Sequence, residues 1–587
     1  MEQHHHERST FSGKLGFVLS AAGASVGLGN IWRFPYLAAK YGGGIFLLIY
    51  IILALTFGYS MIIAETALGR MTKKSPVGAF GKFGKSKWRS FGGWINAIIP
   101  ILIVPYYSVI GGWVIKYLVE YVKGNSQKLA ADGYFSEFIS NGVSTEVCFL
   151  VFAIFTIAII YAGVRNGVER VSKCMMPILV FLSILITIYS VTRPGAMEGV
   201  KYFLVPNIEN FSWMTVVAAM GQMFYSLSIA MGILVTFGSY MKKDVSIEAS
   251  TTNVEIFDTA IAIMAGLMII PAVFAFSGGE PDTLQAGPAL MFITIPKVFA
   301  SMGLGTPVGI LFFVLVLCAA LTSSIALTES AVSTFQDELK WCRQKSTLVV
   351  GAIMVVLGSL SSLGYGPLGF VKIIGMQFLD FFDFLTNSVM MPIAAFATCL
   401  LISRVIGVKK IEEEVLLEGG TFKRKKIFKF YDQISLPDLC SNHPVQFRGK
   451  CIWLDFHVII KIQNPQNLLV IGGCGFFSYV TDSLYFWLIS HIRYIIDSDK
   501  CEWIFTINKV HQFLVFCFIN NRDDFISLLH IVGTIGFVNS STAVKFMDNE
   551  IPEFFFLFGN DAYTAFDIVI ENKMIQDNTV EVCSQNT

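Results

Sequence analysis

Charged residues are scarce in this chain: Asp, Glu, Lys and Arg make up 14% of its 587 residues, against about 25% in soluble domains. Hydrophobic residues make up 54%, and the mean hydropathy is +0.62. These values exclude an ordinary soluble protein and predict a polytopic membrane protein embedded in a lipid bilayer. The net charge is only +1, so the chain lacks the basic field that attracts nucleic acid, and we expect no nucleic-acid partner.

Spacings typical of zinc sites and disulfide frameworks are also missing. The eleven cysteines include no C-x-x-C pair and no Cys/His cluster, so we expect neither feature. We expect no cleavable signal peptide, because the first apolar segment is too long for a signal h-region. The polar residues within the apolar segments form no recognisable pair of nucleophile and base, so we do not expect an enzyme.

Apolar segments long enough to span a membrane are abundant. Ten are predicted, at residues 13–38, 43–68, 91–122, 146–163, 170–191, 212–240, 251–277, 306–335, 347–363 and 371–402. Lysine and arginine gather in the loops that follow even-numbered segments, and the positive-inside rule places these loops in the cytoplasm. We therefore expect a multi-pass protein of the plasma membrane with a cytoplasmic amino-terminal segment (1–12), a ten-helix core (13–402) and a cytoplasmic segment of mixed charge (403–430).

Two of the apolar segments are interrupted by small and polar residues. The first contains GASVGLGNIWR at residues 23–33, and the sixth contains SLSIAMG at residues 226–232. A break in a spanning helix is tolerated where the freed backbone groups face protein, water or a ligand. Close packing through small residues could explain either segment alone. Broken helices that begin the two halves of a five-plus-five set are typical of inverted-repeat transporters with a binding site at the midplane.

Five motifs occur in the order found in one transporter family. They are GASVGLGNIWRFPY (23–36), GQMFYSLSIAMG (221–232), LTSSIAL (321–327), FQDELK (335–340) and FLDFFDFLTNS (378–388). Residues 8–430 thereby resemble the neurotransmitter:sodium symporter family, most closely its bacterial amino-acid transporters. The resemblance implies an all-α polytopic membrane protein. Its transporter core would be a five-plus-five inverted repeat in which helices 1 and 6 are broken. It also implies sodium-coupled symport of a neutral, hydrophobic or aromatic amino acid by alternating access.

The resemblance implies two bound Na⁺ ions held by oxygen ligands. The first sodium site would consist of Ser25, Asn30, Ser226 and Asp258. The second would use backbone carbonyls and hydroxyls of Gly23, Val26, Ala319, Thr322 and Ser323. Considered without the resemblance, the hydroxyls of residues 322–324 could instead bond back to their own helix.

A substrate pocket is implied in the same way. Its residues would be Ser25, Leu28, Gly29, Ile103, Tyr107, Tyr225, Ser226, Ser228, Met231, Ser323 and Leu327. The amides of Leu28 and Gly29 and the hydroxyl of Tyr107 would hold a carboxylate, helped by half-helix dipoles. Monoamine-transporting members carry aspartate where this chain has Gly27, so a monoamine substrate is not expected.

Gates and ion dependence also follow from the resemblance. Arg33, Gln222 and Asp383 would close the outer side, and Arg8, Phe11 and Asp337 the inner side. Gates on both sides argue against an open channel. Phe11 stands where members usually carry tryptophan, so we expect a weaker inner gate. Asp258 replaces an asparagine of chloride-dependent members, and its carboxylate supplies a negative charge, so we expect no chloride requirement.

Two questions stay open at this stage. Residues 431–587 contain no uninterrupted apolar span of about 20 residues and no recognisable motif, and we assign them no function. A shifted reading frame is one explanation, since a back-translation of residues 431–444 read one base later gives MIKYLCPICVLTI, the start of an eleventh helix. An appended cytoplasmic domain is the other. For the function, the alternative is an amino-acid sensor that keeps the site without transporting. The oligomeric state is not predicted.

Overall fold

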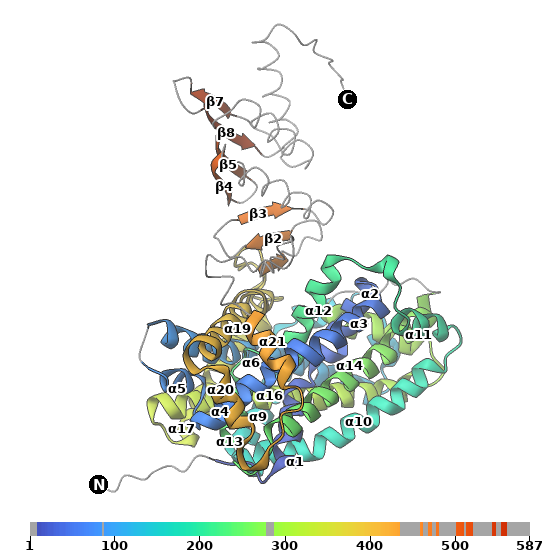
Figure 1. Cartoon of the computed structure of the whole chain (residues 1–587). Coiled ribbons are helices and arrows are strands. Elements are labelled where there is room, and N and C mark those ends of the chain that lie inside the picture. The colour runs from blue at the N-terminus through green and yellow to red at the C-terminus, as the bar shows by residue number, and fades with distance from the viewer. Residues whose placement is uncertain are drawn as a thin grey trace. The chain divides into compact units, whose positions relative to one another are not determined.

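The computed structural model describes residues 9–84, 87–277 and 287–434 and, beyond them, only the backbone of seven strands between residues 458 and 559. For residues 87–89 and 430–434 the backbone alone is described. The chain divides into two compact units, Met1–Cys451 and Ile452–Thr587. The described residues of the first unit form helices, and those of the second unit form strands (Figure 1).

The helical unit begins with the elements of the first five predicted spans. They are α1 (Lys14–Ser25), η1 (Gly29–Arg33), α2 (Phe34–Lys40), α3 (Gly44–Leu53), η2 (Ala54–Gly58), α4 (Tyr59–Thr72), α5 (Pro76–Gly81), α6 (Lys87–Val122), α7 (Ser126–Leu129), α8 (Tyr134–Ser140), α9 (Gly142–Tyr161), η3 (Val164–Glu169) and α10 (Arg170–Val191). The elements η1, η2 and η3 are short π-helical turns that continue directly into α-helices.

The second half repeats this plan and ends in two amphipathic helices. Its elements are α11 (Ala196–Leu204), η4 (Ile208–Asn210), α12 (Trp213–Ser226), α13 (Ile233–Tyr240), α14 (Ile247–Ser277), η6 (Leu290–Thr294), α15 (Ile295–Ala300), α16 (Gly305–Leu339), α17 (Arg343–Leu363), α18 (Phe378–Asp383), η7 (Phe384–Met390), α19 (Met391–Leu400), η8 (Leu401–Ile406), α20 (Val408–Val415), η9 (Leu417–Gly419) and α21 (Lys425–Ile434).

The predicted spans correspond closely to these helices. Within the described residues, eight helices are long and apolar enough to cross a membrane, and α1 with η1–α2, bent by 51°, makes a ninth. The remaining predicted span consists of α12 and α13, each too short to cross alone. The chain is therefore a multi-pass membrane protein, and the all-α, five-plus-five prediction is confirmed for the helical unit.

Both helix breaks have a clear local cause. Between α12 and α13, Ser228, Ala230 and Gly232 have φ of +53°, +60° and +69°, so this stretch cannot continue a right-handed helix. The freed amide of Ala230 donates to Oε1 of Glu65, a buried carboxylate on α4, at 2.9 Å. After α1 the chain becomes extended at Val26 (φ −75°, ψ 94°).

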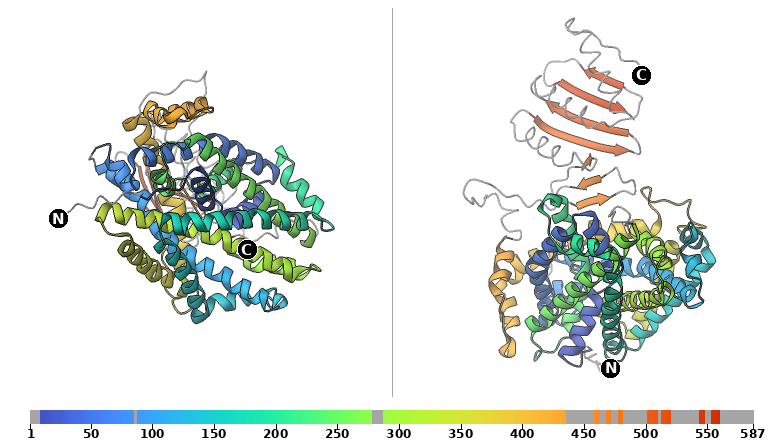
Figure 2. Two further views of the ribbon diagram at one scale, coloured as in Figure 1. Left: turned by 90° about the horizontal axis from the view of Figure 1, so that it is seen from below. Right: turned by 90° about the vertical axis from the view of Figure 1, so that its right-hand side faces the viewer.

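The two broken helices run in opposite directions through the middle of the unit. α1 contacts α13 at one end, and α12 contacts η1 and α2 at the other; Figure 1 shows the first pair low and the second pair high in the helical unit. Seen from below, α1 (dark blue) is surrounded by the other helices (Figure 2, left). The helices α10, α14 and α16 pack against α1, and α4 and α16 pack against α13.

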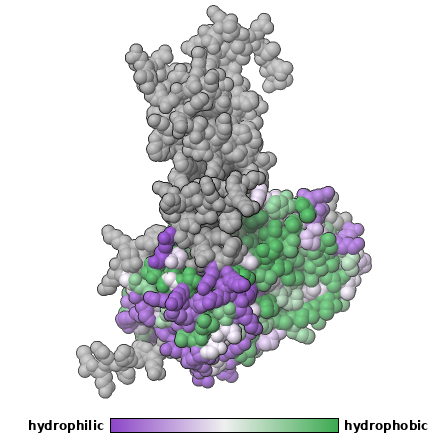
Figure 3. All heavy atoms as spheres, viewed as in Figure 1, coloured by the Kyte–Doolittle hydropathy of each residue, from purple (hydrophilic) through white to green (hydrophobic). Residues whose placement is uncertain are grey.

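The outer surface matches a lipid environment over part of the unit. In the face shown in Figure 3, hydrophobic residues cover the region of α3, α10 and α14, whereas hydrophilic residues gather over α20 and α21. Large aliphatic and aromatic side chains such as Ile154, Phe155 and Phe181 are more than half exposed. In a membrane-spanning protein such side chains face acyl chains rather than water.

Residues 407–434, which we call the carboxyl-terminal clasp, pack against spans two and seven. The guanidinium of Arg70 on α4 pairs with Oε1 of Glu414 at 2.6 Å. Arg424 donates to both carboxylate oxygens of Glu255 on α14, at 3.0 and 2.5 Å, and its guanidinium lies 3.6 Å from the ring centroid of Tyr59. Residues 403–430 are predicted to be a cytoplasmic segment of mixed charge, and in the structure the later part of this segment packs against α4 and α14.

The clasp also has an internal contact between its two helices. Lys425 and Lys429 at the start of α21 both pair with Glu412 on α20, the second at 3.2 Å. The hydrogen bonds from these lysines hold the pKa of Glu412 below its ordinary value. Because both lysine side chains are substantially exposed, we attribute most of the docking strength to Arg70 and Arg424.

The second unit contains two antiparallel sheets. The first joins β1 (Val458–Lys461), β2 (Leu468–Ile471) and β3 (Phe477–Val480) in that order. The second has the order β4-β5-β8-β7 and comprises β4 (Cys501–Lys509), β5 (Gln512–Ile519), β7 (Ala543–Met547) and β8 (Glu553–Gly559). Phe516 on β5 lies opposite Phe556 on β8. The sequence analysis assigns no fold to this region.

The clasp generates a prediction about stability. Arg424→Ala leaves the carboxylate of Glu255, whose side chain is 1% exposed, without its cationic partner, and we expect a loss of about 3 kcal/mol in the free energy of unfolding. Thermal unfolding of the purified protein in detergent measures the effect. The control is Lys409→Ala at an exposed position of α20, which should change stability by about 0.5 kcal/mol or less. Equal stability of the two variants would contradict the importance of the clasp.

Candidate functional site

A small cavity lies where the two helix breaks meet. It is lined by Ala24, Ser25, Gly27, Leu28, Gly29, Ile103, Tyr107, Tyr225, Ser228, Met231, Ile233, Ser323 and Leu327. Ten of the eleven residues predicted for the substrate pocket are in this set; Ser226 is the exception. The cavity measures about 20 Å³, room for roughly one water molecule. Larger molecules can enter only if the surrounding helices move apart.

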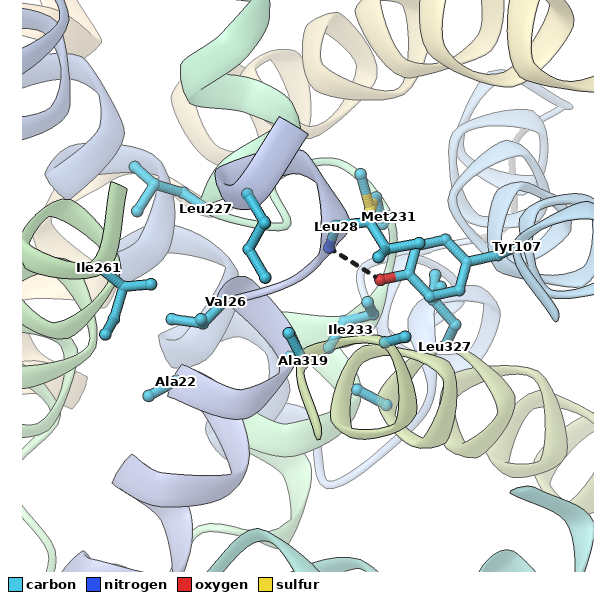
Figure 4. Close-up of a cluster of buried hydrophobic side chains, with 14 of the residues drawn as sticks. Ala22, Val26, Leu28, Tyr107, Leu227, Met231, Ile233, Ile261, Ala319 and Leu327 are labelled. Atoms are coloured by element: carbon cyan, nitrogen blue, oxygen red, sulfur yellow. Dashed lines mark hydrogen bonds between the residues drawn. The ribbon is translucent and has the colours of Figure 1, made fainter. Parts of the chain in front are cut away.

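Backbone groups from the first break face this cavity. The amide of Leu28 donates to the hydroxyl of Tyr107 on α6 at 3.1 Å (Figure 4). A Cβ atom on Gly27 would lie 2.6 Å from the Oγ atom of Ser323 and 3.0 Å from the Tyr107 oxygen, and a Cβ on Gly29 would clash with the ring of Tyr225. Glycine at both positions therefore lets the backbone approach the aromatic wall.

Three of the four residues predicted for the first sodium site form one buried cluster. Asn30 Nδ2 donates to Asp258 Oδ1 at 2.7 Å and to the hydroxyl of Ser226 at 2.9 Å. The hydroxyl of Ser226 lies 3.0 and 2.8 Å from the two carboxylate oxygens of Asp258. Tyr50 donates to the same carboxylate at 3.1 Å. The fourth residue, Ser25, donates to the carbonyl of Ala21 and lines the cavity instead.

This cluster fits a hard cation. Asn30, Ser226 and Asp258 are each 1% exposed or less, and within the described residues the groups that hydrogen-bond the Asp258 carboxylate are Asn30, Ser226 and Tyr50, none of them cationic. A buried carboxylate without a counter-charge is costly. A cation would neutralise it, and rotating the Asn30 amide by 180° would present its oxygen to the ion.

The predicted second sodium site is an oxygen cluster between the first break and α16. The hydroxyl of Ser323 lies 3.2 Å from the carbonyl oxygens of Gly23 and Ala24 and 3.3 Å from that of Val26. The Ala24 carbonyl also accepts the hydroxyl of Ser228 at 3.1 Å, but the one proton of Ser323 cannot satisfy the carbonyls of Gly23 and Val26 at once. The excess of acceptors suits a cation that has lost its hydration shell.

The two neighbouring hydroxyls of α16 behave differently. Thr322 Oγ1 lies 3.0 Å from the carbonyl oxygen of Cys318 and 3.1 Å from that of Ala319, so it bonds back to its own helix. Ser323 instead reaches across to α1. Bonding back to the helix, one interpretation of this polar run, therefore applies to Thr322, and the sodium role of Ser323 stays a prediction. A Cβ on Gly23 would lie 3.2 Å from Thr322 Cβ, which places Thr322 beside the same break.

The predicted outer gate is not closed by an ion pair. The guanidinium of Arg33 lies over the ring of Tyr225, 5.1 Å from its centroid. Asp383 accepts hydrogen bonds from Tyr106 at 3.2 Å and Asn387 at 2.7 Å. These two described side chains form no ion pair within 4 Å in this structure, and their pairing in a closed outer gate stays a prediction.

Gln222, the third residue of the predicted outer gate, contacts the first break directly. Its Nε2 donates to the carbonyl of Gly29 at 3.1 Å. This contact connects α12 with η1, so the two broken helices are joined above the cavity. Gln222 is fully buried.

The inner side is closed by packing. Phe11 is buried and meets the rings of Phe17, Phe237 and Tyr240 edge-on at 5.6–6.0 Å, and its amide donates to the carbonyl of Tyr240. Asp337 accepts the amide of Ser75 at 2.5 Å. Arg8, the predicted partner of Asp337, lies outside the described residues.

Two polar residues that support the site escaped the sequence analysis. Glu65 satisfies the freed amide of Ala230 in the sixth span, and Asn387 holds Asp383. A carboxylate inside an apolar span is itself a signal, so Glu65 could have been singled out from its position in the segment 43–68. Asn387 carries no comparable signal, because only the fold brings it beside Asp383.

A membrane-embedded inverted repeat, with a small cavity and two oxygen clusters at its helix breaks, defines a membrane transporter. The family model of the Sodium:neurotransmitter symporter family matches residues 8–137 and 136–441, and the chain belongs to this family. The resemblance inferred from the five motifs is thereby confirmed. Membership in a transporter family also confirms that the chain is not an enzyme.

Similar proteins support this assignment. The chain is 38% identical over 414 residues to the sodium-dependent transporter YhdH of Bacillus subtilis, covering 70% of this chain and 89% of YhdH. It is 33% identical over 421 residues to a sodium-dependent transporter of Haemophilus influenzae, covering 69% and 91% of the two chains. The crystal structure of MhsT in complex with L-phenylalanine is similar at 36% identity and a TM-score of 0.66, covering 73% of this chain and 97% of MhsT. Such relatives imply sodium as a transported ion.

The tight cavity generates a prediction for Gly27. A methyl group at this position would meet Ser323 Oγ at 2.6 Å, and overpacking of this kind costs about 1–3 kcal/mol. We expect Gly27→Ala to lower the initial rate of sodium-driven uptake by about tenfold. Gly81→Ala, where nothing lies within 4 Å of the added carbon, is the control and should transport normally. Uptake by Gly27→Ala at the level of the control would show that the cavity is not on the transport path.

Proposed function

We propose that the chain couples the inward movement of sodium to the uptake of a neutral amino acid with a hydrophobic or aromatic side chain. The observation that carries this proposal is the cavity between the two helix breaks, lined by ten of the eleven residues implied by the motifs. The cavity is adjacent to both oxygen clusters through Ser25, Gly27 and Ser323. That MhsT, a protein 36% identical in sequence, was crystallised with L-phenylalanine supports the substrate class.

The chemistry of the cavity wall supports an α-amino acid. The Leu28 amide and the Tyr107 hydroxyl, which bond each other at 3.1 Å, would both bind the substrate carboxylate, at the dipole-positive start of η1. Ile103, Met231 and Leu327 form an apolar wall for the side chain. A charged side chain would be desolvated there without a partner, so we exclude acidic and basic amino acids.

Two sodium ions would provide the driving force. One would bind at Asn30, Ser226 and Asp258 and the other between Ser323 and the carbonyls of the first break. Each ion that moves inward across the membrane contributes about 2.3 kcal/mol per 100 mV of membrane potential. The second ion would hold α1 against α16, so its binding favours a closed inner side and its release favours opening toward the cytoplasm.

The location of the activity within the chain is part of the proposal. We propose that the transporter lies in the plasma membrane with its amino terminus in the cytoplasm, as the basic loops indicate. The transport core is residues 13–402, to which the clasp is attached, and residues 431–587 take no part in transport. Resequencing the gene in several clones distinguishes a shifted reading frame from an appended cytoplasmic domain.

Uptake into proteoliposomes tests the main proposal. The full chain and a chain ending at Ile434 are each supplied with labelled amino acids, with and without an inward sodium gradient. We expect sodium-driven accumulation of hydrophobic or aromatic amino acids by both chains. Binding without accumulation by both would contradict transport and indicate a sensor. Accumulation by the shorter chain alone would show that residues 435–587 inhibit the core.

The second sodium site generates a matched pair of variants. Ser323→Ala removes the hydroxyl that faces three carbonyls of the first break, and we expect the half-saturating sodium concentration to rise about tenfold, the effect of losing about 1.4 kcal/mol. Ser324→Ala removes a hydroxyl that contacts Thr156 on α9 instead and should shift sodium dependence by about twofold or less. The sodium titration of substrate binding measures both. Equal shifts in the two variants would count against the site.

Asp258 generates a prediction about chloride. Its carboxylate places a fixed negative charge beside Tyr50 and Ser226, so we expect the same uptake rate when chloride is replaced by gluconate. Asp258→Asn removes this charge, and we expect the variant to transport only when chloride is supplied, because an anion can then replace the lost charge. The control is the unmodified chain in the same two buffers. If the unmodified chain lost uptake when chloride was removed, the prediction that transport needs no chloride would be refuted.

A further inference from the structure

A buried carboxylate at the cytoplasmic end of span five contacts the first half-helix. Glu169 ends the π-helical turn η3 and is 1% exposed. Its Oε2 accepts the amide of Ser12 at 2.9 Å, and its Oε1 accepts the hydroxyl of the same residue. Lys173, one turn further along α10, pairs with Glu169 at 2.6 Å and donates to Ser12 Oγ at 3.0 Å. We call Ser12, Glu169 and Lys173 the Ser12 latch.

The carboxylate of Glu169 packs against the first turn of α1, and it fits there because Gly16 has no side chain. A Cβ atom on Gly16 would clash with the Oε1 and Cδ atoms of Glu169. The N-cap residue of α1 is Gly13, which offers no side-chain cap. The carboxylate of Glu169 therefore lies at the amino-terminal end of α1, where the helix dipole favours a negative charge. This carboxylate comes from span five and not from α1 itself.

The π-helical turn explains how Glu169 can face α1. Single π turns within helices commonly mark functional positions. Here η3 contacts both α1 and α16 and continues directly into α10. Release of the turn or movement of α1 would separate the two groups, so the latch joins elements that can move independently.

The position of α1 determines access to the second oxygen cluster. α1 extends from the latch to Ser25, and the carbonyls of Gly23 and Val26 near its end face Ser323. A cation held there can leave toward the cytoplasm only if α1 separates from α10 and α16. Because the Ser12 latch lies at the opposite end of the same half-helix, such a separation breaks its hydrogen bonds first.

We propose that Glu169 is a positioning residue of the transport cycle: it holds the cytoplasmic half of the first broken helix in the closed arrangement, and its separation from Ser12 is a required step in opening to the cytoplasm. This inference rests on the alternating access of the proposed function. It also explains how an inner gate with Phe11 in place of the larger tryptophan is held closed.

Two glycine-to-alanine variants, Gly16→Ala and Gly221→Ala, distinguish a role of Glu169 in holding α1 closed from a role in supporting the fold alone. Alanine is the better helix former, so if the carboxylate only supported the fold, Gly16→Ala would leave α1 as ordered as before or more so. If the latch holds α1 closed, the added methyl displaces the carboxylate and α1 opens more often. Gly221→Ala in α12 is the matched control, because nothing lies within 4 Å of the added carbon.

Hydrogen–deuterium exchange of the full chain in lipid nanodiscs measures this opening. For Gly16→Ala we expect the peptide covering residues 9–25 to exchange about tenfold faster than in the unmodified chain. This is the effect expected when a hydrogen bond to a charged group is lost. The peptide covering α12 should be unchanged. Saturating sodium should slow the exchange of residues 9–25 again. Gly221→Ala should match the unmodified chain throughout.

Two further variants keep the inference testable if Gly16→Ala misfolds. Glu169→Gln keeps the volume but removes the charge that holds Ser12 and Lys173, and it should also accelerate exchange of residues 9–25. The double variant Gly16→Ala/Glu169→Asp has a shorter acid that makes room for the methyl, and it should restore slow exchange. If Gly16→Ala acted only by making α1 less stable, shortening the acid at residue 169 would not restore slow exchange. A return to slow exchange in the double variant would therefore point to the contact between residues 16 and 169.

The outcomes distinguish this inference from the proposed function. Unchanged exchange in both Gly16→Ala and Glu169→Gln would overturn the latch, whether or not the chain accumulates amino acids. Faster exchange in both, with rescue in the double variant, would support the latch even if uptake by the unmodified chain failed. In that case the uptake assay alone would reject the proposed function.

Discussion

The structure depends on one constraint: backbone groups released by a broken helix must find partners inside an apolar medium. Each break meets it in a different way. The amide of Ala230 is satisfied by the carboxylate of Glu65, and that of Leu28 by the hydroxyl of Tyr107. The carbonyls of the first break face Ser323, which cannot satisfy them all. At the first break, the proposed sodium ion would provide the positive charge that the remaining carbonyl oxygens lack.

Buried charged side chains in the core also need partners. Asp258 is buried with neutral hydrogen-bond partners, whereas Arg70 and Arg424 are paired with carboxylates of the clasp and of α14. The paired charges belong to the framework that holds the helices together. Asp258 belongs to the oxygen cluster next to the cavity, where an ion from solution can supply the missing positive charge.

The sequence predicted the membrane spans because hydropathy is a local signal, whereas most residues of the cavity were implied by the family resemblance that the five motifs carry. It placed Ser226 in the cavity wall, yet the helix ends there and turns this hydroxyl toward Asp258. Thr322 and Ser323 were assigned one role, although neighbouring helical residues point about 100° apart. The distance between Arg33 and Asp383 depends on how far the helices have closed, which no residue pattern encodes. Partners far apart in sequence, such as Ser12 and Glu169, became visible only in the fold.

The clasp has a consequence for how the protein is made. Glu255 enters the membrane with span seven, but Arg424, the cation that neutralises it, follows 169 residues later. At about 5–20 residues per second of synthesis, the carboxylate waits for roughly ten to thirty seconds without its cation. During that interval the seven-span intermediate carries an uncompensated buried acid. The nascent chain therefore cannot assume its final helix packing until almost the whole helical unit has left the ribosome.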